Sequence, residues 1–435
     1  MAKFVLPEVN AVLPDKIQKS DIVFDDEKLV ILEIGEPGKT VSGKILSEFK
    51  GQMVFPGFID PHVHFRTPGK TDAEDWESGS RAALFAGVTT VFDMPNNNPP
   101  VINAESYHEK LILVKSQSRI NFALFGGMTD NNLPELLSME NLKLIKVYLA
   151  STTGSLLVKN LSALKQTADK IFCFHAEHEK KIRENEKNLG AVTNPLDHSK
   201  IRNAETAIHS TNEIIRLQKK IGGNFHISHV STPHEIELLS KSDLSFEVCP
   251  HHLFFSTDDY QELGFFLKCN PPVREPELAR QMRKQLYEKK IQMIATDHAP
   301  HLKSEKERTD QIPPSGVASL EGGTHLILQE AVLKNIDFIY ASEILSSNAA
   351  KRFSVAKRGK ILPGNYADLT IFNPRENWEF TEKHIHSKCG HSPFTGRHFK
   401  GKITASIVNG HLYETQKLRE QCKQNDIKNI HTFIV

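Results

Sequence analysis

Two histidines separated by a single residue, His62 and His64, directly follow the apolar run MVFPGFIDP. Side chains two positions apart on a strand point to the same side, so both imidazoles would face one point in space. Neutral imidazole is a common metal ligand in proteins. A histidine at the end of a strand also often makes only a local hydrogen bond, so this pair needs support from elsewhere in the chain.

Three more residues of metal-binding type end other apolar runs: His175 closes IFCFH, His229 closes FHISH, and Asp297 follows QMIAT. Taken singly, each is better explained as a cap or a local hydrogen-bonding group. Ligand types at the ends of several separate strands are hard to attribute to chance. Four histidines and an aspartate suit a borderline-soft divalent ion. The sequence therefore predicts a metal site, with zinc the first choice and cobalt and manganese left open.

A lysine, Lys146, lies within the run LIKVYLAST, which is otherwise largely apolar. An ammonium cannot bind a cation, but a lysine buried beside metal ions is easily deprotonated. The neutral amine can take up carbon dioxide to form a carbamate, whose two oxygens could bridge two metal ions. The alternatives are a salt-bridging or surface role for Lys146, and Lys143 as the nearby competitor, although Lys146 lies deeper in the apolar run.

These residues are placed by an alternation of short apolar runs and helix-like stretches. The apolar runs, which we expect to form strands, are Met53–Asp60, Thr89–Met94, Asn121–Phe125, Leu144–Leu149, Ile171–His175, Phe225–His229, Leu244–Val248 and Gln292–Thr296. Helix-like stretches between them include Glu77–Ala86, Ala104–Lys115, Ala204–Lys220 and Glu277–Lys289. Eight strand–helix repeats predict an α/β fold of the TIM (β/α)8 barrel type, with a doubly wound open sheet as the alternative. The ligand pattern favours the closed barrel, because it requires side chains that converge from strands spread around a circle.

Both ends of the chain differ from the middle in being rich in short strand-like pieces. Near the start these are Asp21–Phe24 and Leu29–Glu33, and near the end they lie in GKILPGNYADLTIFNP and ITASIVNGHLYE. Neither end is long enough to form a secure domain alone, so we expect one small β-sandwich built from both. The predicted division is residues 1–52 and 357–435 for the sandwich and 53–356 for the barrel. The polar stretch Thr415–Val435 has no assigned place.

The composition excludes several classes of protein. The 435 residues are 39% hydrophobic and 25% charged, and 54 Lys and Arg against 53 Asp and Glu give a net charge of +1. This balance gives no reason to expect nucleic-acid binding. Five cysteines without a CxxC pair indicate a reducing compartment. With neither a signal-peptide pattern nor an uncharged apolar run of transmembrane length, we expect a soluble cytoplasmic protein that does not bind membranes.

Several motifs together resemble those of the cyclic amidohydrolases of the amidohydrolase superfamily. They are PGFIDPHVHFRTPG, MPNNNP, IKVYLAST, FHAE, HISHVST, EVCPHHL, KCNPPVR and ATDHAPH, in the family's order and at family-like separations. The resemblance extends from about Gly51 to Gly410. It implies a TIM barrel, a β-sandwich built from both chain ends, and a centre with two divalent metal ions.

The resemblance also assigns roles to the predicted ligands. It implies that His62, His64 and Asp297 bind the more buried metal ion, and that His175 and His229 bind the other. Lys146, as carboxylysine, would bridge the two ions together with a hydroxide. Two such ions lower the pKa of a shared water from ~15.7 toward ~7. Asp297 would take the proton of this water and pass it to the leaving ring nitrogen.

Within this family, three features resemble the dihydroorotases, which interconvert dihydroorotate and N-carbamoyl-aspartate in pyrimidine biosynthesis. Arg66 follows the histidine pair at the spacing of an HxR motif, Asn96 lies in MPNNNP, and Asn270 opens NPPVR. The resemblance implies that Arg66, Asn96 and His301 hold the substrate carboxylate and that Asn270 lies over the ring. A guanidinium offers a planar fork that matches a carboxylate. The resemblance also suggests a homodimer, with a transcarbamoylase as a candidate partner.

Two alternatives remain open. An allantoinase or a hydantoinase/dihydropyrimidinase would share the metal ions, but its substrate lacks the ring carboxylate, so Arg66 argues against it. A non-catalytic structural subunit of the same family would have lost metal ligands, and all six ligand positions are filled here. The segment around Gly316 matches the family's usual lid only loosely. The neighbouring His251, His252 and His298 are expected to form hydrogen bonds at the barrel mouth.

Overall fold

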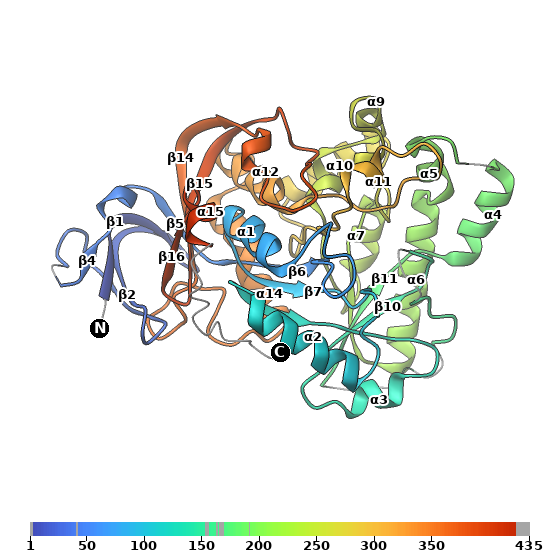
Figure 1. Cartoon of the computed structure of the whole chain (residues 1–435), viewed down its shortest axis with the longest axis horizontal. Coiled ribbons are helices and arrows are strands. Elements are labelled where there is room, and N and C mark those ends of the chain that lie inside the picture. The colour runs from blue at the N-terminus through green and yellow to red at the C-terminus, as the bar shows by residue number, and fades with distance from the viewer. Residues whose placement is uncertain are drawn as a thin grey trace.

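Strands from both ends of the chain pair in one sheet, at the left of the molecule in Figure 1. In the computed structural model, which describes residues 3–40, 42–152, 156–161, 164, 169–190 and 192–422, this sheet has eight strands. They are β1 (Lys3–Val12), β2 (Ile17–Asp25), β3 (Val30–Gly35), β4 (Lys44–Ile45), β5 (Met53–Pro56), β14 (Leu369–Glu379), β15 (His398–Val408) and β16 (His411–Glu414). The order is β16-β15-β14-β5-β1-β2-β3, with β4 paired to β1. The two β-rich ends of the chain thus share one sheet.

The middle of the chain supplies parallel strands. They are β6 (Phe58–Val63), β7 (Val88–Asp93), β8 (Asn121–Leu124), β9 (Gly126–Gly127), β10 (Leu144–Tyr148), β11 (Ile171–His175), β12 (Asn224–Ile227) and β13 (Ser245–Phe246). The first three form one sheet and the other five form a second, and every ladder in both is parallel. Nearly all residues of these strands are buried, as in parallel sheets covered on both faces.

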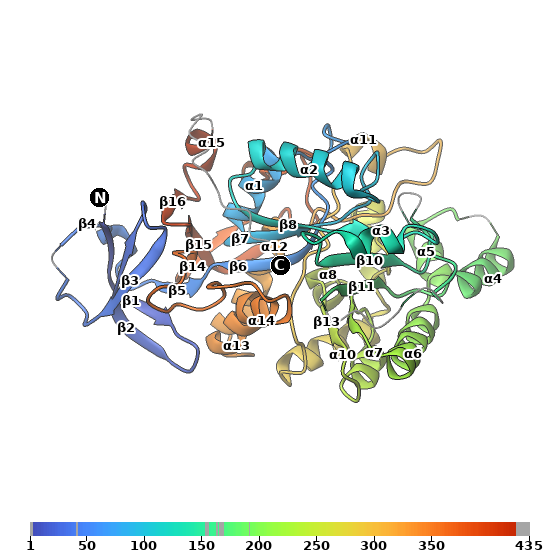
Figure 2. The same cartoon turned by 90° about the horizontal axis from the view of Figure 1, so that it is seen from below.

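Helices flank the parallel strands, with α1 and α2 on one side and α6, α7 and α10 on the other (Figure 2). The helices between β6 and β13 are α1 (Trp76–Phe85), α2 (Ala104–Gln117), α3 (Leu133–Ser138), α4 (Glu179–Leu189), α5 (Pro195–Ile201), α6 (Ala204–Ile221) and α7 (Pro233–Leu239). Those that follow are α8 (Pro250–Phe254), α9 (Tyr260–Leu263), α10 (Pro276–Tyr287), α11 (Lys303–Lys306), α12 (Leu320–Val332), α13 (Phe338–Ser342), α14 (Asn348–Arg352) and α15 (Leu418–Gln421). Side chains of Asp75, Asn103, Asn203 and Thr232 cap four of these helices. None of the described helices combines the length and the apolar character needed to cross a membrane.

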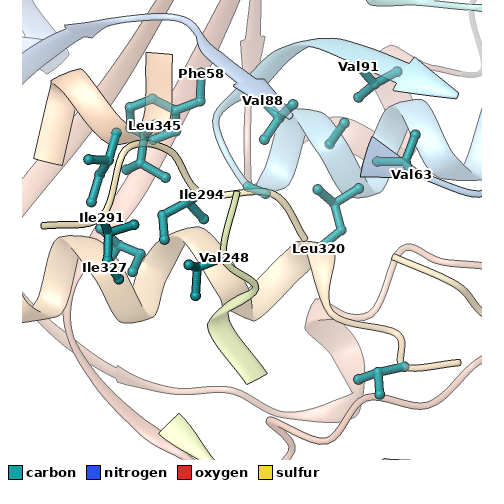
Figure 3. Close-up of a cluster of buried hydrophobic side chains, with 14 of the residues drawn as sticks. Phe58, Val63, Val88, Val91, Val248, Ile291, Ile294, Leu320, Ile327 and Leu345 are labelled. Atoms are coloured by element: carbon teal, nitrogen blue, oxygen red, sulfur yellow. The ribbon is translucent and has the colours of Figure 1, made fainter. Parts of the chain in front are cut away.

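A buried apolar cluster fixes the segment that carries Asp297 against β6. Val63 of β6, Val91 of β7, Ile294 and Leu320 of α12 are among its members, and all are at most 2% exposed (Figure 3). Single parallel bridges join Val63 to His298 and Val248 to Ile294. Residues 294–298 therefore form bridges both to β6 and to the segment that follows β13.

The structure differs from the predicted strands at several places, among them the following three. The run Met53–Asp60 is two strands, because β5 joins the terminal sheet and only β6 pairs with β7. The break falls at Gly57, where a Cβ would lie 2.2 Å from Oγ1 of Thr89, so only glycine allows this close approach. The run 292–296 forms a single bridge, from Ile294 to Val248, rather than a continuous ladder. Strand β1 was not predicted, since a register shift between Leu6 and Val9 interrupts its pattern of alternating burial.

Candidate metal centre

The first predicted ligands meet at the end of β6. Nε2 of His64 lies 3.0 Å, and Nε2 of His62 3.3 Å, from the same carboxylate oxygen of Asp297. The His64 backbone N–H also donates to the His298 carbonyl at 2.8 Å, which ties the end of β6 to the residue after Asp297. The ligand atoms of these three buried side chains lie within 4.8 Å of one another. The structure therefore brings Asp297 into contact with two histidines that lie more than 230 positions before it in the sequence.

A second pair of predicted ligands lies beside the first group. Nδ1 of His175 is 2.9 Å from Nε2 of His229, and the ring centroids of His229 and His62 are 5.3 Å apart. Nδ1 of His229 is buried and has no hydrogen-bond partner among the described residues. Burial lowers the pKa of His64 to about 4 and that of His229 well below its usual value. Both imidazoles are therefore neutral at pH 7, which is the form that binds metal ions.

Lys146 lies in the interior of the parallel sheet and is fully buried. Its ammonium nitrogen is 2.6 Å from the Ser228 hydroxyl, and among the described residues no carboxylate lies within ion-pair distance of it. Burial lowers the pKa of Lys146, which favours the neutral amine that a carbamate requires. The competitor Lys143 is one-third exposed and lies 3.8 Å from the Asp169 carboxylate. Of the two lysines, Lys146 is the buried one, as its predicted role requires.

Two buried carboxylates that the sequence analysis did not single out hold the histidines in place. An oxygen of Glu247 is 2.5 Å from Nδ1 of His62, and an oxygen of Glu177 is 2.9 Å from Nε2 of His175. Burial acts to raise the pKa of Glu247, but His62 and His226 outweigh it, so the pKa lies well below its usual value. Such carboxylates fix the tautomer and orientation of a ligating histidine. Both belong to recognised motifs, EVCPHHL and FHAE, and this was the only available signal.

The predicted substrate residues share a pocket with this cluster. Its walls are formed by His62, His64, Arg66, Asn96, Tyr148, Thr152, His175, His229, Asn270, Asp297, Ala299, Ser315 and Gly316. The Arg66 guanidinium donates to the Pro300 carbonyl at 2.9 Å and lies 3.2 Å from Nε2 of His301. The Asn96 side-chain oxygen is 2.8 Å from Nδ1 of His64. Thus Arg66, Asn96 and Asn270 line the pocket directly, and His301 joins them through Arg66.

The backbone around Gly316, whose role the sequence left in doubt, also lines the pocket. Gly316 has φ +150°, and a Cβ there would lie 2.2 Å from the Ala299 carbonyl oxygen. Its N–H donates to the Lys268 carbonyl at 2.8 Å. The buried ammonium of Lys306 donates to the carbonyls of Phe265 and Pro314, each at 2.9 Å. This segment is therefore anchored to the residues before Asn270 rather than left free above the pocket.

The three other histidines of this region differ in their contacts. His252 lies 2.9 Å from the Pro271 carbonyl and His298 lies 3.1 Å from the Glu74 carboxylate, as the expectation of hydrogen bonding requires. For His251 the expectation is wrong among the described residues, because neither ring nitrogen has a hydrogen-bond partner there.

Comparisons with known proteins agree with this arrangement. Residues 53–413 match the amidohydrolase family, and the chain belongs to that family. It is 33% identical over 404 residues to a dihydroorotase of Methanosarcina mazei, covering 88% of each chain. It is 28% identical over 426 residues to an allantoinase of Salmonella gallinarum, covering 91% of this chain and 93% of that one. Among solved structures, the L-hydantoinase (dihydropyrimidinase) of Arthrobacter aurescens superposes with a TM-score of 0.86 at 24% identity, covering 95% and 96% of the two chains. That last likeness concerns the fold alone.

Proposed function

We propose that this protein is a dihydroorotase, which reversibly hydrolyses the cyclic amide of dihydroorotate to N-carbamoyl-aspartate. The observation that carries the proposal is the Arg66 guanidinium, which lines the same pocket as the histidine cluster and Asp297. A buried cation beside a hydrolytic centre fits a ring that bears a carboxylate. The dihydroorotase relative, 33% identical over 88% of the chain, supports the same substrate.

The donor set fits a pair of divalent ions. His62, His64 and Asp297 would hold one ion, and His175 and His229 the other, with Lys146 as a bridging carbamate. Neutral imidazoles and a carboxylate suit zinc. Among the described residues, Nδ1 of His229 has no hydrogen-bond partner and Lys146 has no carboxylate within ion-pair distance, so neither is engaged elsewhere by such a group. When bound, such ions polarise the ring carbonyl and make water a stronger nucleophile at neutral pH.

Asp297 is the group that moves the proton. Burial acts to raise the pKa of its carboxyl, but His62 and His64 outweigh this, so the pKa lies well below its usual value. The group is therefore a carboxylate at neutral pH and can accept the proton of the attacking water. It then delivers that proton to the ring nitrogen as the amide bond breaks. In the reverse direction the same carboxylate removes a proton from the carbamoyl nitrogen as the ring closes.

The polar side chains of the pocket wall orient the substrate. Arg66 presents a planar fork to the ring carboxylate, with His301 at 3.2 Å as its neighbour. Asn96 extends this carboxylate site toward His64, and Asn270 lies over the ring. The Asn270 side-chain oxygen is 2.8 Å from Nε2 of His198, which holds the amide in one orientation.

We also infer the finer architecture and setting from these observations. The two parallel sheets, joined by the bridges at Val63 and Val248, support a closed (β/α)8 barrel. The proposed division keeps the predicted bounds, 53–356 for this barrel and 1–52 with 357–435 for a β-sandwich, except that β5 (Met53–Pro56) pairs in the terminal sheet. The end of the second range, 423–435, lies outside the described residues. The protein would act in the cytoplasm as a homodimer on a small molecule, with a transcarbamoylase as a candidate partner.

The test is a turnover assay with dihydroorotate, allantoin and dihydrouracil side by side, together with elemental analysis of the purified protein. We expect dihydroorotate to be the best substrate and two divalent ions per chain. Faster turnover of allantoin or dihydrouracil would replace this proposal with an allantoinase or a dihydropyrimidinase. A folded protein without metal ions and without turnover would identify a non-catalytic family member.

A further inference from the structure

A second cluster of metal-binding side chains lies close to the proposed centre and takes no part in it. Cys249, His251 and His252 stand on and just before the short helix α8, and one ligand atom of each lies within 4.8 Å of the others. Their exposed fractions are 0%, 0% and 2%. The cluster is thus a compact group of one thiol and two imidazoles in the protein interior.

The tautomer of His252 is fixed by its surroundings. Its Nε2 lies 2.9 Å from the Pro271 carbonyl oxygen, which can only accept, so Nε2 carries the proton. The lone pair is then on Nδ1, which is buried and has no hydrogen-bond partner among the described residues. A ring nitrogen that donates to a backbone carbonyl while the other stays free is the arrangement found in ligating histidines.

His251 is more unusual, because neither of its ring nitrogens has a partner among the described residues although the side chain is fully buried. Its ring centroid lies 4.4 Å from that of His252. The equally buried His298 shows the ordinary solution, since its ring bonds both to the Glu74 carboxylate and to the Leu320 N–H. A buried polar group without such partners calls for a physical explanation.

The surrounding charges favour a cation at this place. Burial raises the pKa of the Cys249 thiol well above its usual value, and the negative charges of Asp297, Glu247 and Asp60 raise it further. The same charges would stabilise a positive ion bound to the sulfur. The charge of Asp297 also acts on His251. The cluster and the proposed catalytic carboxylate are therefore electrostatic neighbours.

We propose that Cys249, His251 and His252 form an additional site for a thiophilic divalent cation such as Zn²⁺ or Cd²⁺. Binding forms a metal–sulfur bond, breaks the S–H bond and releases that proton to solvent, with no change in oxidation state. Thiolate and imidazole are the ligands that such ions prefer. A cation at this site also attracts the carboxylate of Asp297 and weakens it as a base, so occupancy inhibits turnover at excess metal.

The experiment compares the wild type with Cys249→Ser, with His251→Gln, and with Cys422→Ser as a matched control. Cys422 is also a buried free cysteine but ends α15, far along the chain from the cluster. Each protein is purified from zinc-supplemented cells and analysed for zinc per chain. Each is then incubated with Cd²⁺ alone, and the ultraviolet thiolate-to-cadmium absorption is recorded. Circular dichroism checks that each variant folds. If a variant does not fold, the cadmium–thiolate absorption of the wild type still tests whether a thiolate binds the ion.

The proposal expects one more ion per chain in wild type and Cys422→Ser than in Cys249→Ser and His251→Gln, and a cadmium–thiolate band that Cys249→Ser lacks. Inhibition by excess zinc should require about tenfold more metal in Cys249→Ser, because one ligand is lost. Equal metal content and equal absorption in all four proteins would overturn it. This test is independent of the proposed function. A protein that binds one ion through Cys249 but shows no turnover would support the additional metal site and contradict the proposed dihydroorotase activity.

Discussion

Two groups of residues in and around the pocket are supported in different ways. Buried carboxylates hold His62 and His175 of the predicted ligand cluster, whereas backbone carbonyls contact Arg66 and His301 of the predicted substrate site. We use floor for the predicted ligand residues His62, His64, Lys146, His175, His229 and Asp297, and rim for Arg66, Asn96, His301, Ser315 and Gly316. Lys146 and His301 are included for their predicted roles and do not line the pocket themselves. Floor residues lie on parallel strands or within two residues of their ends, apart from Asp297, which lies between the bridged residues Ile294 and His298. Most rim residues lie in connecting segments.

This difference suggests distinct roles for the two groups, with the floor serving the chemical step and the rim serving substrate recognition. Carboxylates behind the floor set which ring nitrogen carries a proton, so they control the charge of the ligand set. The backbone carbonyls that Arg66 and His301 contact carry no titratable charge and fix direction and shape, and in the described part of the chain the one carboxylate within ion-pair distance of this rim pair, Glu305, lies 3.5 Å from Nδ1 of His301. Changes to the floor should therefore alter metal content and the chemical step, and changes to the rim should alter the choice and binding of substrate.

Removing a bridging residue should have the largest effect. Lys146→Ala should lose bound metal and reduce turnover to the detection limit, because the proposed carbamate would hold both ions. Short carboxylic acids with excess zinc should restore part of both. The matched control is Lys143→Ala, which removes a partly exposed lysine three residues away and should retain wild-type metal content and turnover. Full metal content in Lys146→Ala would exclude the bridging role.

The second-largest effect is expected from blocking the proposed proton transfer by Asp297. Asp297→Asn keeps the shape of the side chain but cannot accept a proton, so kcat should fall ~10²-fold or more. Elemental analysis of the same sample separates this loss from weakened metal binding. Turnover close to that of the wild type at unchanged metal content would remove Asp297 from the proton transfer.

A change at the rim should lower kcat/KM for a substrate with a ring carboxylate more than for one without it. In Arg66→Ala, kcat/KM for dihydroorotate should drop ~10²-fold, since charged hydrogen bonds contribute ~1.5–3 kcal/mol each. Metal content should stay at the wild-type level, and dihydrouracil, which lacks the carboxylate, should lose little further activity. Arg66→Lys should rescue only in part, because it keeps the charge and loses the fork. An equal loss for both substrates would contradict recognition of a carboxylate.

Weakening the support of the floor should have an intermediate effect. Glu247→Gln removes the negative charge next to Nδ1 of His62, so metal affinity should fall by about 10- to 100-fold. A chelator-competition titration measures this affinity. The control Glu235→Gln alters another buried carboxylate, which bonds to Thr232 and Thr211, and should change stability without changing metal affinity. Identical affinities in the two variants would show that Glu247 only stabilises the fold.

The smallest effect is expected from the support of the rim. Lys306→Met removes the hydrogen bonds to the Phe265 and Pro314 carbonyls next to Ser315 and Gly316, so KM should rise by about tenfold at nearly unchanged kcat. Lys303→Met on the same helix α11 is the control, because Lys303 is exposed and, in the described part of the chain, pairs only with Glu307. A fall in kcat with unchanged KM would place the effect at the floor instead.

The sequence by itself determined which residue types stand at or near the ends of the parallel strands. A side-chain period of two puts His62 and His64 on one side of a strand whatever the rest of the chain does. The burial of Lys146 followed from the apolar residues around it, and β11 (Ile171–His175) has the predicted bounds. These features are local, so they could be predicted without knowing which segments meet.

Only the tertiary structure decided which groups face each other. Glu247 and His62 are 185 positions apart, and no local pattern specifies that their side chains lie 2.5 Å from each other. The split of the first strand at Gly57 depends on Thr89 of β7, and the placement of Asp297 depends on the bridge between Val63 and His298. Among the described residues, the ring of His251 has no hydrogen-bond partner, whereas the ring of its neighbour His252 is hydrogen-bonded to the Pro271 carbonyl. The two residues share one motif, so this difference results from the packing around α8. Contacts of this kind are set by strand register and by the packing of distant segments, which the order of residues along one segment does not contain.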